Sequence, residues 1–236
     1  MGRWWGDARD NSGRDGAPRE ADGGEPDWER QRAALIEGLR ERDRVSDCAL
    51  EALAAVPRHE FVPESRRRDA YADRPLSIGQ GQTISAPHMV AIMVDRLELE
   101  PGLEVLEIGT GCGYHAAVTA EIVGAENVYS VEYHATLADR ARVRLEQLGY
   151  GEISITVGDG HAGWPEHAPY DRTYLTCAAA EIPSAVLDQL RPDGLFLGPI
   201  GRDRQTLIRA RKRADGSIDR ESFGGVRFVE MQGGTD

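Results

Sequence analysis

Three glycines that alternate with other residues directly follow an apolar run of the chain. Positions 105–108 read Val-Leu-Glu-Ile, then come Gly109, Gly111 and Gly113, and a helical pattern starts at Tyr114. Glycine lets a backbone pass close to a ligand, and a helix N-terminus offers unpaired N–H groups. The segment therefore predicts either a tight strand-to-helix turn or the turn of a nucleotide site. The dinucleotide pattern G-x-G-x-x-G needs glycine at position 114, which argues against a nicotinamide cofactor.

Two acidic residues follow the next two apolar runs. Glu132 ends the run 127–132, and Asp159 comes shortly after the run 153–157. The first carboxylate is placed to accept hydrogen bonds from both hydroxyls of a ribose, and the second from the exocyclic amine of an adenine. Each acid alone is also typical of a solvated loop, but parallel strands bring their carboxyl ends to one crevice. Together with the glycines they favour an adenosine-containing ligand, and the missing diphosphate pattern favours S-adenosylmethionine.

A further group of motifs lies upstream of the glycines. Positions 56–63 read VPRHEFVP and positions 76–89 read LSIGQGQTISAPHM. With the segment LEIGTGCGY at 106–114, they resemble the protein-L-isoaspartate O-methyltransferase family. The likeness extends over about residues 46–231. Its specific part is the block GQTISAPH, because other methyltransferases share the glycine loop but not this lead-in.

The resemblance implies a repair enzyme that uses S-adenosylmethionine to methylate the free α-carboxylate of L-isoaspartyl residues in damaged proteins. D-Aspartyl residues stay open as a second acceptor. The ester then closes to a succinimide, whose hydrolysis returns some normal aspartate. The family's active-site hydroxyl matches Ser85. The residues expected to hold the cofactor are Thr83, His88, Glu107, Gly109, Gly111, Glu132, Asp159 and Gly160. No metal is expected, since the histidines lack metal-ligand spacing.

Such a transfer needs positioning more than acid–base catalysis. A carboxylate with a pKa of about 4 is already ionised at pH 7, so no strong general base is required. Holding the carboxylate oxygen, methyl carbon and sulfonium sulfur in line lowers the barrier by about 7–11 kcal/mol. Ser85 would orient the carboxylate by hydrogen bonding. Its alternative interpretation is the N-cap of a helix that begins at Ala86-Pro87.

Two other functions are compatible with the same cofactor site. A homologue that kept the cofactor site but lost catalysis would act as an adaptor, and a methyltransferase for another acceptor, such as a small molecule or RNA, would share the same sheet. The intact segment 83–85 beside an intact glycine loop argues against the adaptor. Three positions depart from the family pattern: Ala180 stands where proline is usual, and Glu230 and Gln232 lie in a segment that usually reads Val-Pro-Leu. Gln232 is therefore not assigned to the cofactor.

Periodicity predicts the elements that position these residues. Helical spacing begins at Trp28 and again before Ala49, with Asp27 and Ser46 as N-caps. Strands are expected over 103–108, 127–132, 153–157, 171–176, 195–200, 205–211 and 226–231, and helices over 86–97, 114–123, 134–148 and 183–190. The fold class is α/β: a Rossmann-like, doubly wound and mostly parallel sheet with a helical N-terminal lead-in and antiparallel C-terminal strands.

Composition divides the chain into two parts. Residues 1–27 are rich in Gly, Asp, Arg and Glu, and too poor in aliphatic side chains to offset the entropy of ordering. We expect a disordered tail there. Residues 28–232 are expected to form the methyltransferase domain, with 28–98 as the helical lead-in that carries the active-site motif and 99–232 as the cofactor-binding sheet.

Charge and hydropathy restrict partners and location. Lys and Arg number 28 and Asp and Glu 40, a net charge of −12, which argues against a nucleic-acid partner. No stretch approaches the roughly 20 apolar residues of a membrane span, nor does the N-terminus read as a secretion signal. We expect a cytoplasmic monomer that acts on isoaspartyl-containing proteins and peptides. Lys212 is the only lysine, which favours a halophilic surface or, alternatively, a GC-rich genome.

Overall fold

A central sheet of seven strands organises the part of the chain that the computed structural model describes, residues 27–234. The strand order is β5-β4-β3-β6-β7-β8-β9. The parallel strands are β3 (Val105–Ile108), β4 (Val128–Glu132), β5 (Ser154–Val157), β6 (Tyr170–Leu175) and β7 (Leu190–Ile200). The antiparallel strands are β8 (Gln205–Lys212) and β9 (Ile218–Val226). The predicted fold class is confirmed.

Helices cover both faces of this sheet. The crossovers contain α4 (Tyr114–Val123), α5 (Ala135–Gln147) and α6 (Ser184–Asp188). β3 is buried along its whole length, as expected of a central parallel strand. Its side chains alternate between two hydrophobic clusters, with Val105 in one and Leu106 and Ile108 in the other. The glycine loop thus emerges from the best-covered strand of the sheet.

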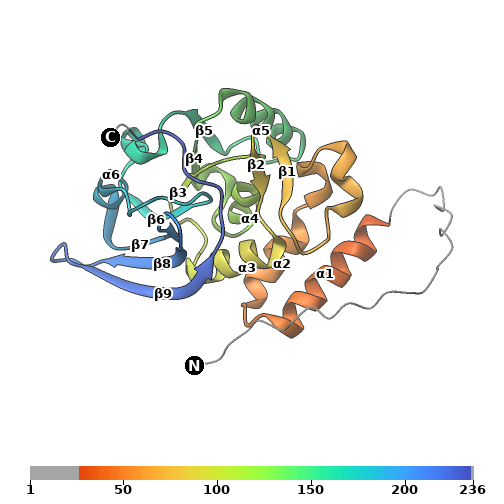
Figure 1. Cartoon of the computed structure of the whole chain (residues 1–236), viewed down its shortest axis with the longest axis horizontal. Helices are drawn as coiled ribbons and strands as arrows, with labels where there is room; N and C mark the ends of the chain where they lie inside the picture. Colours follow the sequence, from red (N-terminus) through yellow and green to blue (C-terminus); the bar gives the residue numbers. More distant parts are fainter. Residues whose placement is uncertain (1–26, 235–236) are drawn as a thin grey trace.

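The N-terminal lead-in lies at one end of the molecule and the β8–β9 hairpin at the other (Figure 1). It consists of α1 (Trp28–Arg42), α2 (Asp47–Ala55) and α3 (Pro87–Arg96), together with the two-stranded hairpin β1 (Leu76–Gly79) and β2 (Gln82–Ile84). The hairpin was not predicted, because its four-residue and three-residue strands are too short for a clear period. It carries the specific sequence block toward the glycine loop.

Two predicted helix caps are confirmed and one is wrong. The Asp27 carboxylate accepts from the N–H of Arg30 at 2.9 Å, and the Ser46 hydroxyl accepts from the N–H of Ala49 at 3.4 Å. Ser85 does not cap α3, because the N-cap position falls one residue later on Ala86, without any side-chain hydrogen bond. The predicted disordered tail, apart from Asp27, lies outside the described residues.

The last strand was predicted in the wrong place. Instead of 226–231, the structure has β9 over Ile218–Val226. The later segment shows alternating apolar residues, but it leaves the sheet edge and forms only an isolated parallel bridge from Glu230 to Ala178. β9 itself is mostly exposed and polar, so it lacks the apolar alternation of a half-buried strand.

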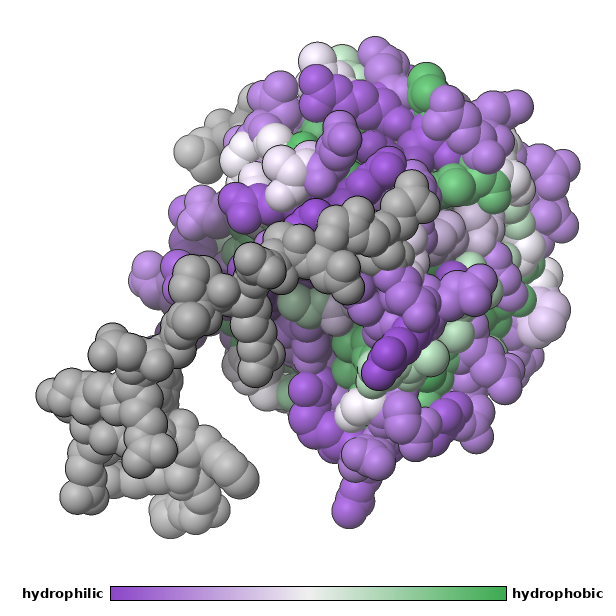
Figure 2. All heavy atoms as spheres, turned by 90° about the vertical axis from the view of Figure 1, so that its right-hand side faces the viewer, coloured by the Kyte–Doolittle hydropathy of each residue, from purple (hydrophilic) through white to green (hydrophobic). Residues whose placement is uncertain are grey.

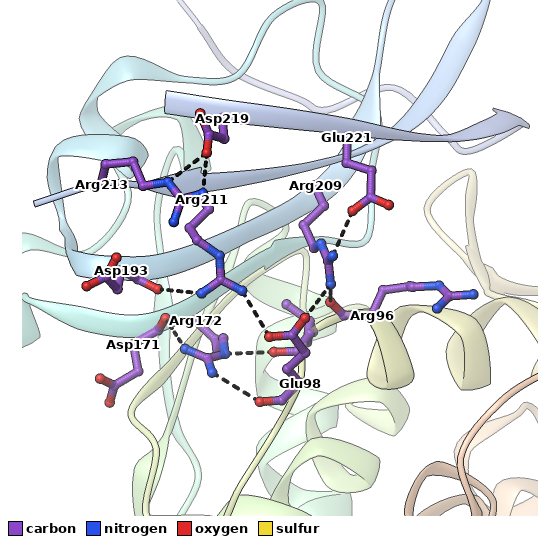
Figure 3. Close-up of polar contacts among 11 residues, drawn as sticks. Arg96, Glu98, Asp171, Arg172, Asp193, Arg209, Arg211, Arg213, Asp219 and Glu221 are labelled. Atoms are coloured by element: carbon purple, nitrogen blue, oxygen red, sulfur yellow. Dashed lines mark hydrogen bonds and ion pairs between the residues drawn. The ribbon is translucent and has the colours of Figure 1, made fainter. Parts of the chain in front are cut away.

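Arginines from the sheet hold the C-terminal end of α3 (Figure 3). Arg172 donates to the carbonyl of Leu97 at 2.6 Å and to that of Glu98 at 3.1 Å. Arg209 donates to the carbonyl of Arg96 at 3.1 Å. The last carbonyls of a helix have no partners within it, so these bonds satisfy groups that would otherwise stay unpaired. The helix that follows the predicted active-site serine is thereby fixed to β6 and β8.

The face on the side of α1 is largely hydrophilic where it is visible, with small scattered hydrophobic areas (Figure 2). α1 buries Ile36 and Leu39 and exposes most of its charged residues. None of the helices within residues 27–234 is long and apolar enough to cross a membrane.

Candidate active site

A cleft of about 520 Å³, which we call the outer chamber, lies at the carboxyl ends of β3, β4 and β6. This is the edge at which open α/β sheets bind ligands. Of the predicted cofactor residues, five line it: Thr83, Gly109, Gly111, Glu132 and Gly160. The lining also contains Gln82, Ile108, Val131, Tyr133, His134, Thr176, Cys177, Val229, Glu230, Met231 and Gln232.

The glycine loop has no room for larger residues. Gly109 and Gly111 have φ angles of +100° and +56°, which L side chains rarely adopt. A Cβ on Gly109 would lie 2.3 Å from the Thr176 hydroxyl oxygen. That hydroxyl donates to the Gly109 carbonyl at 2.5 Å, so β6 holds the loop in place. The loop backbone consequently forms one wall of the outer chamber.

Glu132 is fixed at the end of β4 with its carboxylate at the chamber wall. One oxygen accepts from the N–H of Gly111 at 2.8 Å and the other from the N–H of His134 at 2.9 Å. Each carboxylate oxygen has a further lone pair. The side chain is therefore preorganised to accept two more hydrogen bonds, as a pair of adjacent ribose hydroxyls requires.

A second, smaller hollow of about 300 Å³, the inner chamber, contains Ser85. Four residues line both chambers: Thr83, Gly109, Gly111 and Thr176. The other residues that line the inner chamber are Ile84, Val90, Thr110, Cys112, Tyr114 and His115. Ser85 thus lines only the inner chamber and Glu132 only the outer one, and the two chambers share part of their lining.

Arg58 fixes the backbone at Ser85. Its guanidinium is fully buried, with Nε donating to the Ala70 carbonyl at 2.8 Å and Nη2 to the Ser85 carbonyl at 2.7 Å. It lies 4.8 Å from the centroid of the Tyr114 ring, and burial lowers the pKa of the guanidinium. Within residues 27–234, Nη1 has no hydrogen-bond partner. The lead-in motif around Arg58 therefore supports the serine segment from behind.

The structure buries Glu107 instead of placing it at the cleft surface. Its side chain is 0% exposed and accepts from Ser130 at 2.5 Å and Tyr174 at 2.9 Å. Burial raises the pKa of Glu107 to about 8. Glu107 therefore lines neither chamber. Its carboxyl group instead links β3 to β4 and β6 through these two hydrogen bonds.

Two other predicted cofactor residues also point to protein partners. His88 lines neither chamber, and its Nδ1 and backbone nitrogen both lie 2.9 Å from one oxygen of Asp73. The Asp159 carboxylate accepts from the N–H of His161 at 2.9 Å and from that of Gly234 at 2.7 Å. The adjacent Gly160 does line the outer chamber.

Residues 229–232, which the sequence left unassigned, form part of the wall of the outer chamber. The Ala178 N–H donates to the Val229 carbonyl and the Met231 N–H donates to the Ala178 carbonyl, both at 2.8 Å. These bonds attach the segment beside the end of β6, where Glu230 and Gln232 line the outer chamber. The resemblance puts this segment at the C-terminal edge of the site, but the departure of these two positions from the family pattern left their assignment open.

The charges of the outer chamber suit a cationic adenosine cofactor. The lining includes two carboxylates, Glu132 and Glu230, and no Arg or Lys. A diphosphate would be bound by cations, whereas a sulfonium is attracted by carboxylates. Metal chemistry has no evident site in the described part of the chain, where no group of three or more His, Cys, Asp or Glu residues is arranged to hold an ion.

Comparison with known proteins gives one consistent family. The model of the family described as Protein-L-isoaspartate(D-aspartate) O-methyltransferase (PCMT) matches residues 30–236. Protein-L-isoaspartate O-methyltransferase 2 of Archaeoglobus fulgidus is 50% identical over 208 residues, covering 88% of this chain and 95% of its own length. Protein-L-isoaspartate O-methyltransferase of Methanosarcina mazei is 48% identical over 210 residues, covering 89% and 86%.

Solved structures agree with these relatives. One protein-L-isoaspartate O-methyltransferase superposes with a TM-score of 0.79 at 32% identity, over 86% of this chain and 66% of that one. A putative protein-L-isoaspartate O-methyltransferase from Plasmodium falciparum, solved in complex with S-adenosyl-L-homocysteine, gives a TM-score of 0.77 at 25% identity, over 88% of this chain and 99% of that one.

Proposed function

The chain belongs to the protein-L-isoaspartate(D-aspartate) O-methyltransferase family and uses S-adenosylmethionine to methylate isoaspartyl residues of proteins, and we propose that its two chambers divide this reaction between them. The outer chamber holds the cofactor, and the inner chamber receives the acceptor carboxylate. The observation that carries the proposal is the wall of four shared residues, with Glu132 on the outer side and Ser85 on the inner side.

In the outer chamber, Glu132 accepts from the ribose hydroxyls, while Gly109 and Gly111 allow the loop backbone to lie against the ligand. Bound there, S-adenosylmethionine supplies an electrophilic methyl group. Thr83 and Gly160 complete the contacts, and Glu107 supports the loop from below. The cofactor contacts of His88 and Asp159 stay predictions.

In the inner chamber, Ser85 donates a hydrogen bond to the acceptor carboxylate and orients it toward the shared wall. The carboxylate is ionised at neutral pH, so the chain has no proton to remove. The lining of the chamber contains no Asp, Glu, Lys or Arg, so its contribution is to position the substrate through neutral groups. Arg58 keeps Ser85 in place through the serine carbonyl.

The same division assigns roles along the chain. The lead-in, residues 28–98, supplies Thr83 and Ser85, and the sheet, residues 99–232, supplies Glu132 and the glycine loop. The monomeric state, the cytoplasmic location, the lack of nucleic-acid and membrane partners and the halophilic character stay predictions from composition.

The test is methyl transfer to two peptides that differ only in one L-isoaspartyl or L-aspartyl linkage, with Ser85→Ala and Ser77→Ala compared with the unaltered enzyme. Ser77 lies on the exposed side of β1 and serves as the control. We expect Ser85→Ala to lower kcat/KM for the isoaspartyl peptide by about tenfold or more, because a hydrogen bond to a charged group is lost. S-adenosylhomocysteine affinity should stay unchanged. Full activity of Ser85→Ala would remove the serine from the proposal.

A further inference from the structure

A buried histidine in the inner chamber has no partner for either ring nitrogen. His115 is the second residue of α4, is 6% exposed and lines the chamber together with Ser85. Within residues 27–234, neither its Nδ1 nor its Nε2 makes a hydrogen bond. Buried polar groups nearly always find a partner, and one left unpaired costs about 1–3 kcal/mol. The unpaired imidazole therefore needs an explanation.

The groups around His115 do find partners. The Thr110 hydroxyl bonds to Ser130 at 2.6 Å, and the Thr119 hydroxyl bonds to Tyr174 at 3.0 Å. The His115 ring packs against the Tyr174 ring with centroids 4.5 Å apart. The neighbouring hydroxyls are thus paired and one face of the imidazole is packed, whereas both of its ring nitrogens lack a partner within the described residues.

Burial also decides which protonation state His115 has. It lowers the pKa of the imidazole to about 3, so the ring is neutral at physiological pH. A neutral imidazole carries one N–H donor and one acceptor nitrogen. In the inner chamber, the donor can be satisfied by an oxygen of whatever enters.

We propose that His115 is a substrate-binding residue, whose ring N–H donates to the acceptor carboxylate beside the hydroxyl of Ser85. This inference rests on the proposed function, since it assumes that the inner chamber receives that carboxylate. Two neutral donors, one from the β2–α3 junction and one from α4, would recognise a carboxylate without a buried positive charge at its oxygens. The chamber then selects a planar anionic group held by neutral donors.

The experiment compares His115→Leu and His115→Gln with the unaltered enzyme. Binding of the L-isoaspartyl peptide to enzyme saturated with S-adenosylhomocysteine is measured by calorimetry, and KM and kcat are measured separately. We expect His115→Leu to weaken peptide binding and raise KM by about tenfold, the value of a hydrogen bond to a charged acceptor. His115→Gln keeps a donor and should recover part of this loss. Affinity for S-adenosylhomocysteine should not change.

The Tm of the variants distinguishes a role of His115 in substrate binding from a structural role. If the substrate is the missing partner, His115→Leu removes an unpaired polar group and keeps or raises Tm. Thr119→Val is the matched control, because it removes a buried hydrogen bond from the same helix and should lower Tm without changing KM. A lower Tm with unchanged KM in His115→Leu would show that a buried water satisfies the ring, and would overturn the inference.

The two proposals fail in different ways. Failure of the unaltered enzyme to methylate or bind the isoaspartyl peptide would overturn the assignment of the inner chamber itself. Normal activity of the unaltered enzyme together with normal peptide binding by His115→Leu would overturn only the role of His115.

Discussion

The β8–β9 edge and the inner chamber differ in how two of their side chains are paired. At the β8–β9 edge, the Glu98 carboxylate pairs with Arg209 at 2.7 Å and with Arg211 at 3.0 Å (Figure 3). In the lining of the inner chamber, both ring nitrogens of His115 have no partner within the described residues. The Glu98 carboxylate is thus complemented by the protein itself, whereas the His115 imidazole is not.

The difference shows that the number of ionic contacts in a region is a poor guide to its importance for function. The pairs at the edge are partly exposed, and such pairs contribute little to stability. The unpaired imidazole of the inner chamber reduces stability, and proteins tolerate such features where function requires them. Four experiments test this contrast, beginning with the largest expected effect.

Glycine substitutions compare the two regions directly. Gly109→Ala combines a positive φ with a clash at Thr176, so we expect the free energy of unfolding to fall by about 3 kcal/mol. Gly216, in the turn between β8 and β9, has a φ of +83° but nothing within 4 Å of an added Cβ. Gly216→Ala should therefore cost only about 1–2 kcal/mol. Urea denaturation measures both, and equal losses would show that the loop is not tightly packed.

Removing one carboxylate from each region separates binding from stability. Glu132→Ala should weaken S-adenosylhomocysteine binding by about tenfold or more, because hydrogen bonds to a charged acceptor are lost and the glycine loop loses its anchor at Gly111. Glu98→Gln, at the edge, should leave that affinity unchanged. Calorimetry measures the affinity of each protein for S-adenosylhomocysteine. Equal affinities for Glu132→Ala and the unaltered enzyme would exclude Glu132 from the cofactor site.

The raised pKa of Glu107 predicts how the free energy of unfolding depends on pH. Its folded-state pKa of about 8 lies above the ordinary value of 4.5, so the folded state binds a proton that the unfolded state has released. The stabilising contribution is complete below about pH 4.5 and is lost as pH rises through 8. Relative to Glu107→Gln, the unaltered protein should lose more than about 1 kcal/mol between pH 5 and 8. A parallel pH dependence of both proteins, measured by urea denaturation, would contradict this.

Salt should distinguish the exposed ion pairs from the buried groups. Glu98→Gln is expected to lower the free energy of unfolding by less than about 1 kcal/mol in dilute buffer. In molar salt the Debye length falls to about 3 Å, and the difference should shrink further. Thermal unfolding at the two salt concentrations measures it, and a salt-independent difference would show that the loss does not come from exposed charge–charge attraction.

The sequence alone predicted the order of the parallel strands along the chain and the carboxylate at the end of β4, because both depend on local pattern. It left the assignment of residues 229–232 open, since only the backbone bonds to Ala178, about fifty residues earlier, place them at the cleft. In the sequence, His115 differs in no way from the other histidines, which lack the spacing of metal ligands. The absence of partners that makes it notable is a property of the packed structure.

The two chambers touch through only four residues, and their remaining linings differ. Under the proposed assignment, the cofactor and the acceptor enter different chambers and their reacting atoms meet at the shared residues. Because both substrates must be bound before the methyl group is transferred, this corresponds to a sequential mechanism with a ternary complex. Initial-rate plots for the two substrates would intersect instead of running parallel, and each product would leave through its own compartment.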